Sequence, residues 1–273
     1  MKRSLKALLY YTLLVILWGA WVRISHSGNG CGEHWPLCQG EVIPIGANQK
    51  TWIELSHRMM SGFFGIFVFA LFIRSLFLYE KNHNVRKWIG WSLFFTVTEA
   101  LLGARLVLAG LVGDNNSWGR ALTMSLHMLN SLFLVGSIAM AHFSVDRPNA
   151  KINFKKWLGF FAGIAITGAI ASLAVTLFPS TSLLEGLNKD LSSDSPWILR
   201  LRVLHPFLAL LFSGHASGWF YKRNKRLSAL FAIQVLVGLM TLFLLSPLPL
   251  KIFHLFLVHW IWIHLVRWCA SDE

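Results

Sequence analysis

Apolar residues occur along the chain in eight long runs that polar and charged segments separate. An α-helix of roughly 17–25 apolar residues crosses the ~30 Å hydrocarbon core of a bilayer. We therefore predict eight transmembrane helices, at 5–22, 52–78, 88–110, 119–143, 156–178, 197–220, 227–245 and 251–268.

The first run also resembles a signal peptide, because it follows Met1-Lys2-Arg3. However, the run is long, no small-x-small cleavage site stands out, and seven further runs follow it. We therefore expect an uncleaved helix, with a signal peptide as the alternative.

The composition agrees with a membrane protein. Hydrophobic residues make up 55% of the 273 and charged residues 14%, which excludes an ordinary soluble domain. The longest segments between runs are 23–51 and 179–196, so we expect no separate soluble domain.

The basic residues predict the topology. A formal net charge of +13 would suit a nucleic-acid partner, but the charge follows the helices instead. Basic groups recur at the N-terminus and after every second helix, as the positive-inside rule requires, so both termini are predicted to be cytoplasmic. No nucleic-acid partner is expected. The predicted inner-side residues are Lys2, Arg3, Lys6, Arg74, Lys81, Arg86, Lys87, Arg147, Lys151, Lys155, Lys156, Lys222, Arg223, Lys225, Arg226 and Arg267.

The second half of the chain repeats features of the first. Glu99 and Gly103 of the third predicted helix correspond to Gln234 and Gly238 of the seventh. The other matches are Gly19 with Gly168, His57 with His205, and His127 with His254. A duplicated membrane unit has this pattern.

The predicted fold class is thus an all-α integral membrane protein, with eight transmembrane helices as two pseudo-repeated four-helix bundles. We expect the halves to be 1–146 and 147–273, joined by the basic linker 147–156.

Four of the 11 histidines lie at one predicted depth. Each even-numbered predicted helix carries one of them, and all four lie within roughly 12 Å of the outer boundary of the membrane. Neutral imidazoles on facing helices can hold a haem iron, so two axial pairs are predicted. The alternative is that each histidine hydrogen-bonds a neighbouring helix. The four are His57, His127, His205 and His254.

Five arginines fall in or beside the same outer layer and are candidate partners for haem propionates, because guanidinium groups bind carboxylates through paired hydrogen bonds. Snorkelling toward lipid headgroups is the alternative for each. They are Arg58, Arg105, Arg120, Arg200 and Arg202.

Two acids are notable. Glu54 lies three residues before His57, on one helical face, where a carboxylate can take part in proton transfer. An acid tolerated near a helix N-terminus is the alternative. Glu99 lies near mid-membrane, and a pair with Arg105 is one interpretation, although a spacing of six is poor for contact on one helix.

Cys31 and Cys38 lie in the first predicted outer loop, on the oxidising side of a bacterial-type inner membrane. The six residues between them include Gly32 and Pro36, which allow a turn. A disulfide suits this loop, and two unpaired thiols are the alternative.

These motifs resemble the haem A synthase family. The resemblance rests on a Cys31-x6-Cys38 loop that ends Trp35-Pro36-Leu37-Cys38, followed by Glu54-x-x-His57-Arg58. It implies oxidation of the C8 methyl group of haem O to the formyl group of haem A. It also implies that the loop cysteines form a disulfide.

By the same resemblance, the N-terminal half is the reaction site, with His57 and His127 as ligands and Glu54 as the acid needed for turnover. The C-terminal half holds haem b through His205 and His254. Glu99 departs from the expected pattern, since a glutamine is expected there.

The resemblance implies haem O as substrate, haem A as product, membrane lipid as surroundings, and a haem O synthase and an electron donor as partners in terminal oxidase assembly. The haem sites would face the periplasmic side of a bacterial-type inner membrane. The alternatives are a bis-histidine dihaem b-type cytochrome that relays electrons from quinol, and a non-catalytic haem-binding assembly factor. Glu54 favours the enzyme, because an electron relay has no need for a carboxylate in one half only. The position three before His205, which corresponds to Glu54, is Arg202.

Overall fold

The computed structural model describes residues 1–148 and 155–270, and within these ranges it contains helices and no strand. Eight helices are long and apolar enough to cross a membrane, which confirms that prediction. The helices are α1 (Lys2–Ile24), α2 (Gln49–Leu78), α3 (Asn84–Leu108), α4 (Trp118–Phe143), α5 (Lys155–Leu177), α6 (Leu183–Leu191), α7 (Trp197–Arg202), α8 (Leu204–Tyr221), α9 (Lys225–Phe243) and α10 (Leu248–Cys269).

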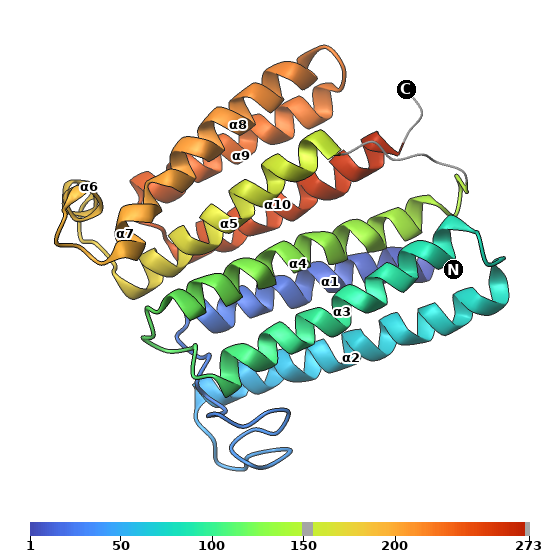
Figure 1. The fold of residues 1–273 in the computed structure, drawn as a ribbon, viewed down its shortest axis with the longest axis horizontal. Helices are drawn as coiled ribbons and strands as arrows, with labels where there is room; N and C mark the ends of the chain where they lie inside the picture. The colour runs from blue at the N-terminus through green and yellow to red at the C-terminus, as the bar shows by residue number, and fades with distance from the viewer. Residues whose placement is uncertain (149–154, 271–273) are drawn as a thin grey trace. The chain divides into compact units, whose positions relative to one another are not determined.

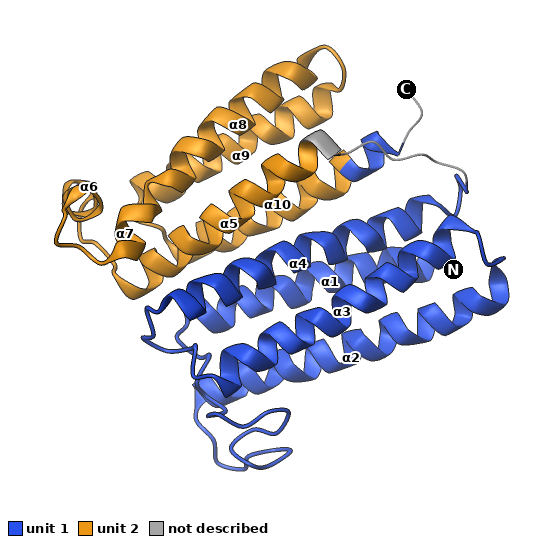
Figure 2. Ribbon diagram, in the orientation of Figure 1, with its two compact units in different colours: residues 1–154, 266–273 blue, residues 155–265 orange. Residues whose placement is uncertain are grey.

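The chain divides into two compact units (Figure 2). Unit 1 comprises residues 1–154 and 266–273, and unit 2 comprises residues 155–265. Most of the predicted linker 147–156 lies outside the described residues.

In unit 1, α1 to α4 lie side by side and run up and down (Figure 1). Each of α1, α2 and α3 contacts the next helix in chain order, and α4 contacts α1. Small residues let α3 approach α4, where the hydroxyls of Ser92 and Ser137 are 2.9 Å apart. The result is a closed four-helix bundle.

In unit 2, aromatic side chains join α5, α8, α9 and α10. The ring centres of Phe161 and Trp262 are 4.9 Å apart, those of Phe161 and Phe212 are 5.9 Å apart, and those of Phe212 and Phe231 are 6.1 Å apart. Aromatic rings bury a large apolar area each, so this cluster forms the core of the unit.

The span predicted at 197–220 consists of two helices that meet at Val203. Pro206 explains the break, because a proline lacks the N–H that would bond to the carbonyl four residues earlier, at Arg202. The structure thus locates the effect of this proline at the end of α7.

The predicted loop 179–196 contains a helix that the sequence analysis missed, α6. The Ser182 hydroxyl accepts a hydrogen bond from the N–H of Glu185 at its first turn. A serine followed three residues later by glutamate is a capping signal, which this stretch of loop does carry.

The loop between α1 and α2 is held by the Cys31–Cys38 disulfide, which confirms that prediction. Both cysteines are fully buried. The Thr51 hydroxyl donates to the Gly30 carbonyl at 2.8 Å, and a Cβ at Gly30 would lie 2.6 Å from the Lys50 backbone. The loop therefore packs directly on the first turn of α2.

We use "loop end" for the end of unit 1 at which α1 and α3 finish, and for the end of unit 2 at which α5 and α9 finish. In unit 1 this end carries residues 25–48 and 109–117. In unit 2 it carries α6, α7 and residues 244–247.

Candidate functional site

His57 lies near the start of α2 and contacts α1 at Gly19. A Cβ at Gly19 would lie 2.9 Å from His57 Cε1 and 3.1 Å from Nε2, so a larger residue there would displace the imidazole. The buried Nδ1 of His57 has no hydrogen-bond partner among the described residues. Buried polar atoms usually have a hydrogen-bond partner, so this nitrogen is consistent with a partner from a bound molecule or water.

His127 lies near the start of α4, at the same loop end. Its Nδ1 is 2.7 Å from Oε1 of Glu99 on α3, and its Nε2 lies 3.7 Å from the position of a Cβ at Gly103. Glu99 therefore pairs with His127, and the suggested pair with Arg105 was wrong. Six residues along one helix place two side chains on different faces, whereas α4 packs directly against α3.

Unit 2 contains the corresponding contacts. A Cβ at Gly168 of α5 would lie 3.0 Å from His205 Cε1, and one at Gly238 of α9 would lie 3.2 Å from His254 Cε1. The hydroxyl of Thr167 is 3.3 Å from His205 Nδ1. All four predicted ligand histidines thus lie against a helix glycine on a neighbouring span.

The two histidines of unit 2 are close together. Their ring centres are 6.3 Å apart and their planes are nearly perpendicular, at 86°. Two imidazoles that share one iron, each through a metal–nitrogen bond of about 2 Å, have ring centres about 6 Å apart. The separation of His205 and His254 matches this value, so the spacing of these two residues fits a haem.

Glu54 is buried on the first turns of α2, with 4% of its surface exposed. Its Oε1 accepts from Arg58 Nη2 at 2.5 Å and its Oε2 accepts from the backbone N–H of Cys31 at 2.9 Å. The carboxylate is therefore fixed by its own helix and by the disulfide-bonded loop.

Three of the five predicted propionate arginines hold loops in place. Arg58 also donates to the carbonyls of His34 and Leu37, both at 2.6 Å. Buried Arg120 donates to the carbonyls of Gly113 and Asn115.

In unit 2, Arg202 pairs with Asp190 of α6 at 2.7 Å and donates to the Gly186 carbonyl. The other two arginines, Arg105 and Arg200, are exposed on their units. The five arginines therefore divide into three that fix loops and two that face outward.

Sequence reasoning missed several contributors to the site. Asn130 and Ser131 both donate to the Glu99 carboxylate. They are polar residues three and four positions after His127, in an otherwise apolar span, and this spacing puts all three on one helical face. Asp190 lies in a region that was predicted to be a loop, so no pattern in the sequence indicated its ion pair with Arg202.

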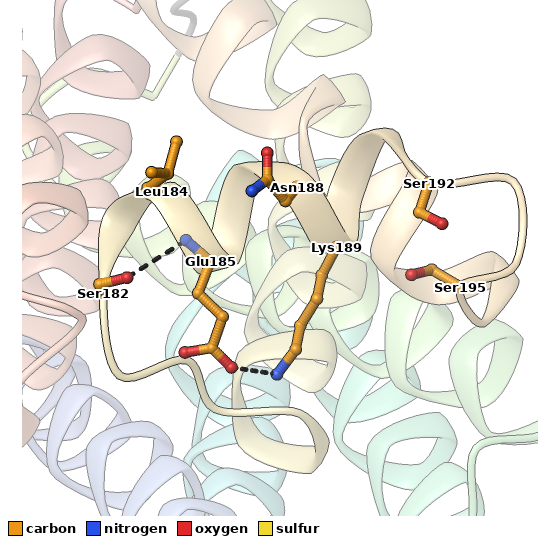
Figure 3. Close-up of a pocket in the computed structure, with 7 residues that line it drawn as sticks. All are labelled: Ser182, Leu184, Glu185, Asn188, Lys189, Ser192 and Ser195. Carbon is orange, nitrogen blue, oxygen red and sulfur yellow. Dashed lines mark hydrogen bonds and ion pairs between the residues drawn. The ribbon is translucent and has the colours of Figure 1, made fainter.

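A shallow groove of about 620 Å³ follows α6, and no predicted site residue lines it (Figure 3). The Lys189 ammonium, with the hydroxyl and N–H of Thr181, lowers the pKa of the Glu185 carboxyl to about 2. The groove is lined by Ser182, Leu184, Glu185, Asn188, Lys189, Ser192 and Ser195.

Comparisons with known proteins place the chain in a family. The sequence model of a family described as cytochrome oxidase assembly protein, COX15-CtaA, matches residues 3–266. The chain is 36% identical to "Protoheme IX farnesyltransferase" of two Thermus thermophilus strains, over 96% of this chain and 47% of theirs. It therefore spans about half the length of these relatives. It is 30% identical to "Heme A synthase" of Bacillus cereus and Bacillus anthracis, over 93% of this chain and 88% of theirs.

Proposed function

The chain belongs to the COX15-CtaA family of cytochrome oxidase assembly proteins, the haem A synthase family, and from this premise we propose that it is itself a haem A synthase. In this proposal it is an oxidoreductase that oxidises the C8 methyl group of haem O to a formyl group. The observation that carries the proposal is the glycine contact at all four predicted ligand histidines, combined with a buried carboxylate, Glu54, three residues before His57, where unit 2 has Arg202 before His205.

The two units are a pseudo-repeat in this proposal, each based on four membrane spans. Gly19 beside His57 corresponds to Gly168 beside His205, and the other two glycine–histidine contacts correspond in the same way. Both termini are cytoplasmic, as the basic residues indicate.

The N-terminal half binds the substrate, and the C-terminal half binds a cofactor. His57 and His127 hold haem O, and His205 and His254 hold haem b. When bound, haem b supplies electron transfer. Each imidazole packs against a helix glycine, and at Gly19, Gly168 and Gly238 a side chain would displace the ring from this position.

Glu54 handles the proton in this mechanism. Arg58 and the Cys31 N–H hold its two oxygens in one orientation, so a proton that leaves the reaction site has a fixed acceptor. The same carboxylate stabilises positive charge that develops next to it.

The propionate groups bind to arginine. Arg105 and Arg200 are the first candidates, one in each unit, because their guanidinium groups are exposed. Arg58, Arg120 and Arg202 remain candidates through N–H groups that their loop contacts leave over.

The Thermus relatives are named for transfer of a farnesyl group, but this chain matches less than half of their length. The Bacillus relatives named for haem A synthesis match over 88% of theirs, which favours the oxidation reaction. A haem O synthase is then the partner that supplies the substrate.

The proposed location is a bacterial-type inner membrane, with lipid around the spans and the haem sites toward the periplasmic side. The electron donor that the resemblance implies would be a component of the same membrane. The loop disulfide supports this orientation, because disulfides form on the oxidising side of such a membrane.

The test is to purify the full chain from cells that supply haem O, and to identify the extracted haems by mass. We expect haem A or hydroxylated haem O. Haem B alone would support the second candidate, a bis-histidine cytochrome, which the 6.3 Å pair in unit 2 would also suit. Weak, exchangeable haem without conversion would support a non-catalytic assembly factor.

A further inference from the structure

Glu99 is an acidic residue that has no role in the proposed oxidation. It lies within a span on α3, with 19% of its side chain exposed. Charged side chains within membrane spans are costly and are usually retained for function. This acid therefore needs an explanation beyond packing.

The carboxylate contacts three side chains of α4. Its Oε1 is 2.7 Å from His127 Nδ1 and also accepts from the Ser131 hydroxyl, and its Oε2 accepts from Asn130 Nδ2 at 2.6 Å. Both oxygens are thus fixed.

Asn130 is itself held in position. Its Oδ1 accepts from the Thr98 hydroxyl at 2.7 Å, and its Nδ2 also donates to the Phe95 carbonyl at 2.8 Å. These hydrogen bonds therefore orient the Glu99 carboxylate toward His127 and restrict the rotation of its side chain.

A hydrogen bond at one nitrogen of an imidazole decides what the other nitrogen can do. A carboxylate accepts and does not donate, so it keeps the proton of His127 on Nδ1 and leaves the lone pair of Nε2 available for a metal. It also makes the imidazole a stronger electron donor.

Unit 2 has a neutral group at the corresponding place. Gln234 precedes Gly238 by four residues, as Glu99 precedes Gly103, and its Nε2 is 3.2 Å from both ring nitrogens of His254. In either orientation of the amide, glutamine adds no charge beside the ring. The two histidines therefore have the same neighbour position but different charge.

We propose that Glu99 is a positioning residue, which fixes the tautomer of His127 and gives unit 1 a more electron-rich iron ligand than unit 2. This inference rests on the proposed function in one respect, that His127 binds the haem iron. A more electron-rich ligand favours oxidised iron, so the reduction potential of the unit 1 haem is lower than it would be with an amide at this position.

The test is a redox titration of the purified, haem-loaded full chain, followed by absorption and electron paramagnetic resonance spectra. His127→Ala and His254→Ala assign the signals to each unit. In Glu99→Gln, we expect the potential of the unit 1 haem to become more positive, while that of the unit 2 haem does not change.

The matched variant is Gln234→Glu. It should make the potential of the unit 2 haem more negative and leave the unit 1 haem unchanged. Because it does not touch the Glu99 network, it tests the same principle if Glu99→Gln fails to fold.

Unchanged potentials and resonance spectra in both variants would overturn the inference, as would a His127→Ala protein whose unit 1 haem is unaltered. Haem A formation by the wild-type protein is measured in parallel. Shifted potentials without haem A formation would support the role of Glu99 and refute the proposed function, whereas haem A formation with unresponsive potentials would do the reverse.

Discussion

The two units place their four histidines in the same way but surround them with different polar groups. In unit 1, Glu99 pairs with His127, and Glu54 lies one turn before His57. In unit 2, the nearest polar partners of the two histidines are Gln234 and Thr167, which are neutral. In the proposed function, the glycine contacts would position the ligand histidines alike in both units, and the carboxylates of unit 1 would serve proton transfer.

Each unit also has a buried acid–arginine pair at its loop end, but the positions are exchanged. In unit 1, the acid and the arginine, Glu54 and Arg58, both lie on the span that carries the histidine. In unit 2, the acid is Asp190 of the loop helix α6, and only Arg202 is close to the histidine in sequence. The acid of the pair therefore lies on the histidine-bearing span in unit 1 and on a separate loop helix in unit 2.

Loss of Glu54 should give the largest difference between the units. Glu54→Ala should lower the rate of haem A formation by at least about 100-fold, because general acid–base groups contribute that much or more. Extracted haem would be quantified by mass, and both haem spectra recorded. Haem A formation at the wild-type rate would contradict the role of Glu54 and remove the main functional contrast between the units.

The glycine contacts predict a graded effect on haem binding. Gly19→Ala should reduce haem affinity in unit 1 and Gly168→Ala in unit 2, each by about 10–100-fold, because the new methyl group displaces the ligand histidine. Gly103→Ala should have less effect, since its Cβ would make an ordinary 3.7 Å contact. Haem titrations followed by absorption would measure all three.

Gly62→Ala is the matched control, because a Cβ at Gly62 would meet no atom within 4 Å. Equal losses in Gly62→Ala and Gly19→Ala would show that the helix, and not the contact with the imidazole, responds to the change.

Removing the disulfide should affect unit 1 alone. Cys31→Ser with Cys38→Ser should destabilise the loop by about 2 kcal/mol, because the unfolded loop gains freedom, and should loosen the Cys31 N–H contact to Glu54. We expect slower haem A formation with an unchanged unit 2 spectrum. An equal change in the spectra of both units would argue against a local effect.

The smallest effect concerns α6. Since the pKa of Glu185 is lowered to about 2 from its ordinary value of 4.5, its pairs with Lys189 and Thr181 stabilise the helix above pH 4.5 and are lost as the pH falls toward 2. Hydrogen exchange, corrected for intrinsic rates, should show constant protection of α6 between pH 5 and 8. Glu185→Gln should lower that protection slightly, and protection that changes across this range would contradict the assignment.

The sequence was sufficient for the spans, because length and apolar composition decide whether a helix can cross a bilayer. It was sufficient for the disulfide as well, since Cys31 and Cys38 lie in one short loop. It failed for α6, whose nine residues are too few for a periodic signal, although Ser182 and Glu185 marked its start.

The partner of Glu99 was also wrong, for a physical reason. Arg105 was the nearest opposite charge along the chain, but the real contact, with His127, depends on how α3 packs against α4. The repeat did contain the information, because Gln234 occupies the matching place next to His254. The ligand roles of the four histidines and the propionate roles of the arginines remain predictions.

The unbroken α2 and the interrupted α7–α8 differ mechanically. Helix α2 runs for 30 residues, so Glu54, His57 and Arg58 move together as parts of one stiff rod. The missing backbone hydrogen bond before Pro206 makes the junction at Val203 a compliant joint, so tilting of α7 with Arg202 need not turn His205. A displacement of the loop between α1 and α2 would thus be passed to His57 through one continuous helix, whereas the joint at Val203 separates His205 from α6 and α7.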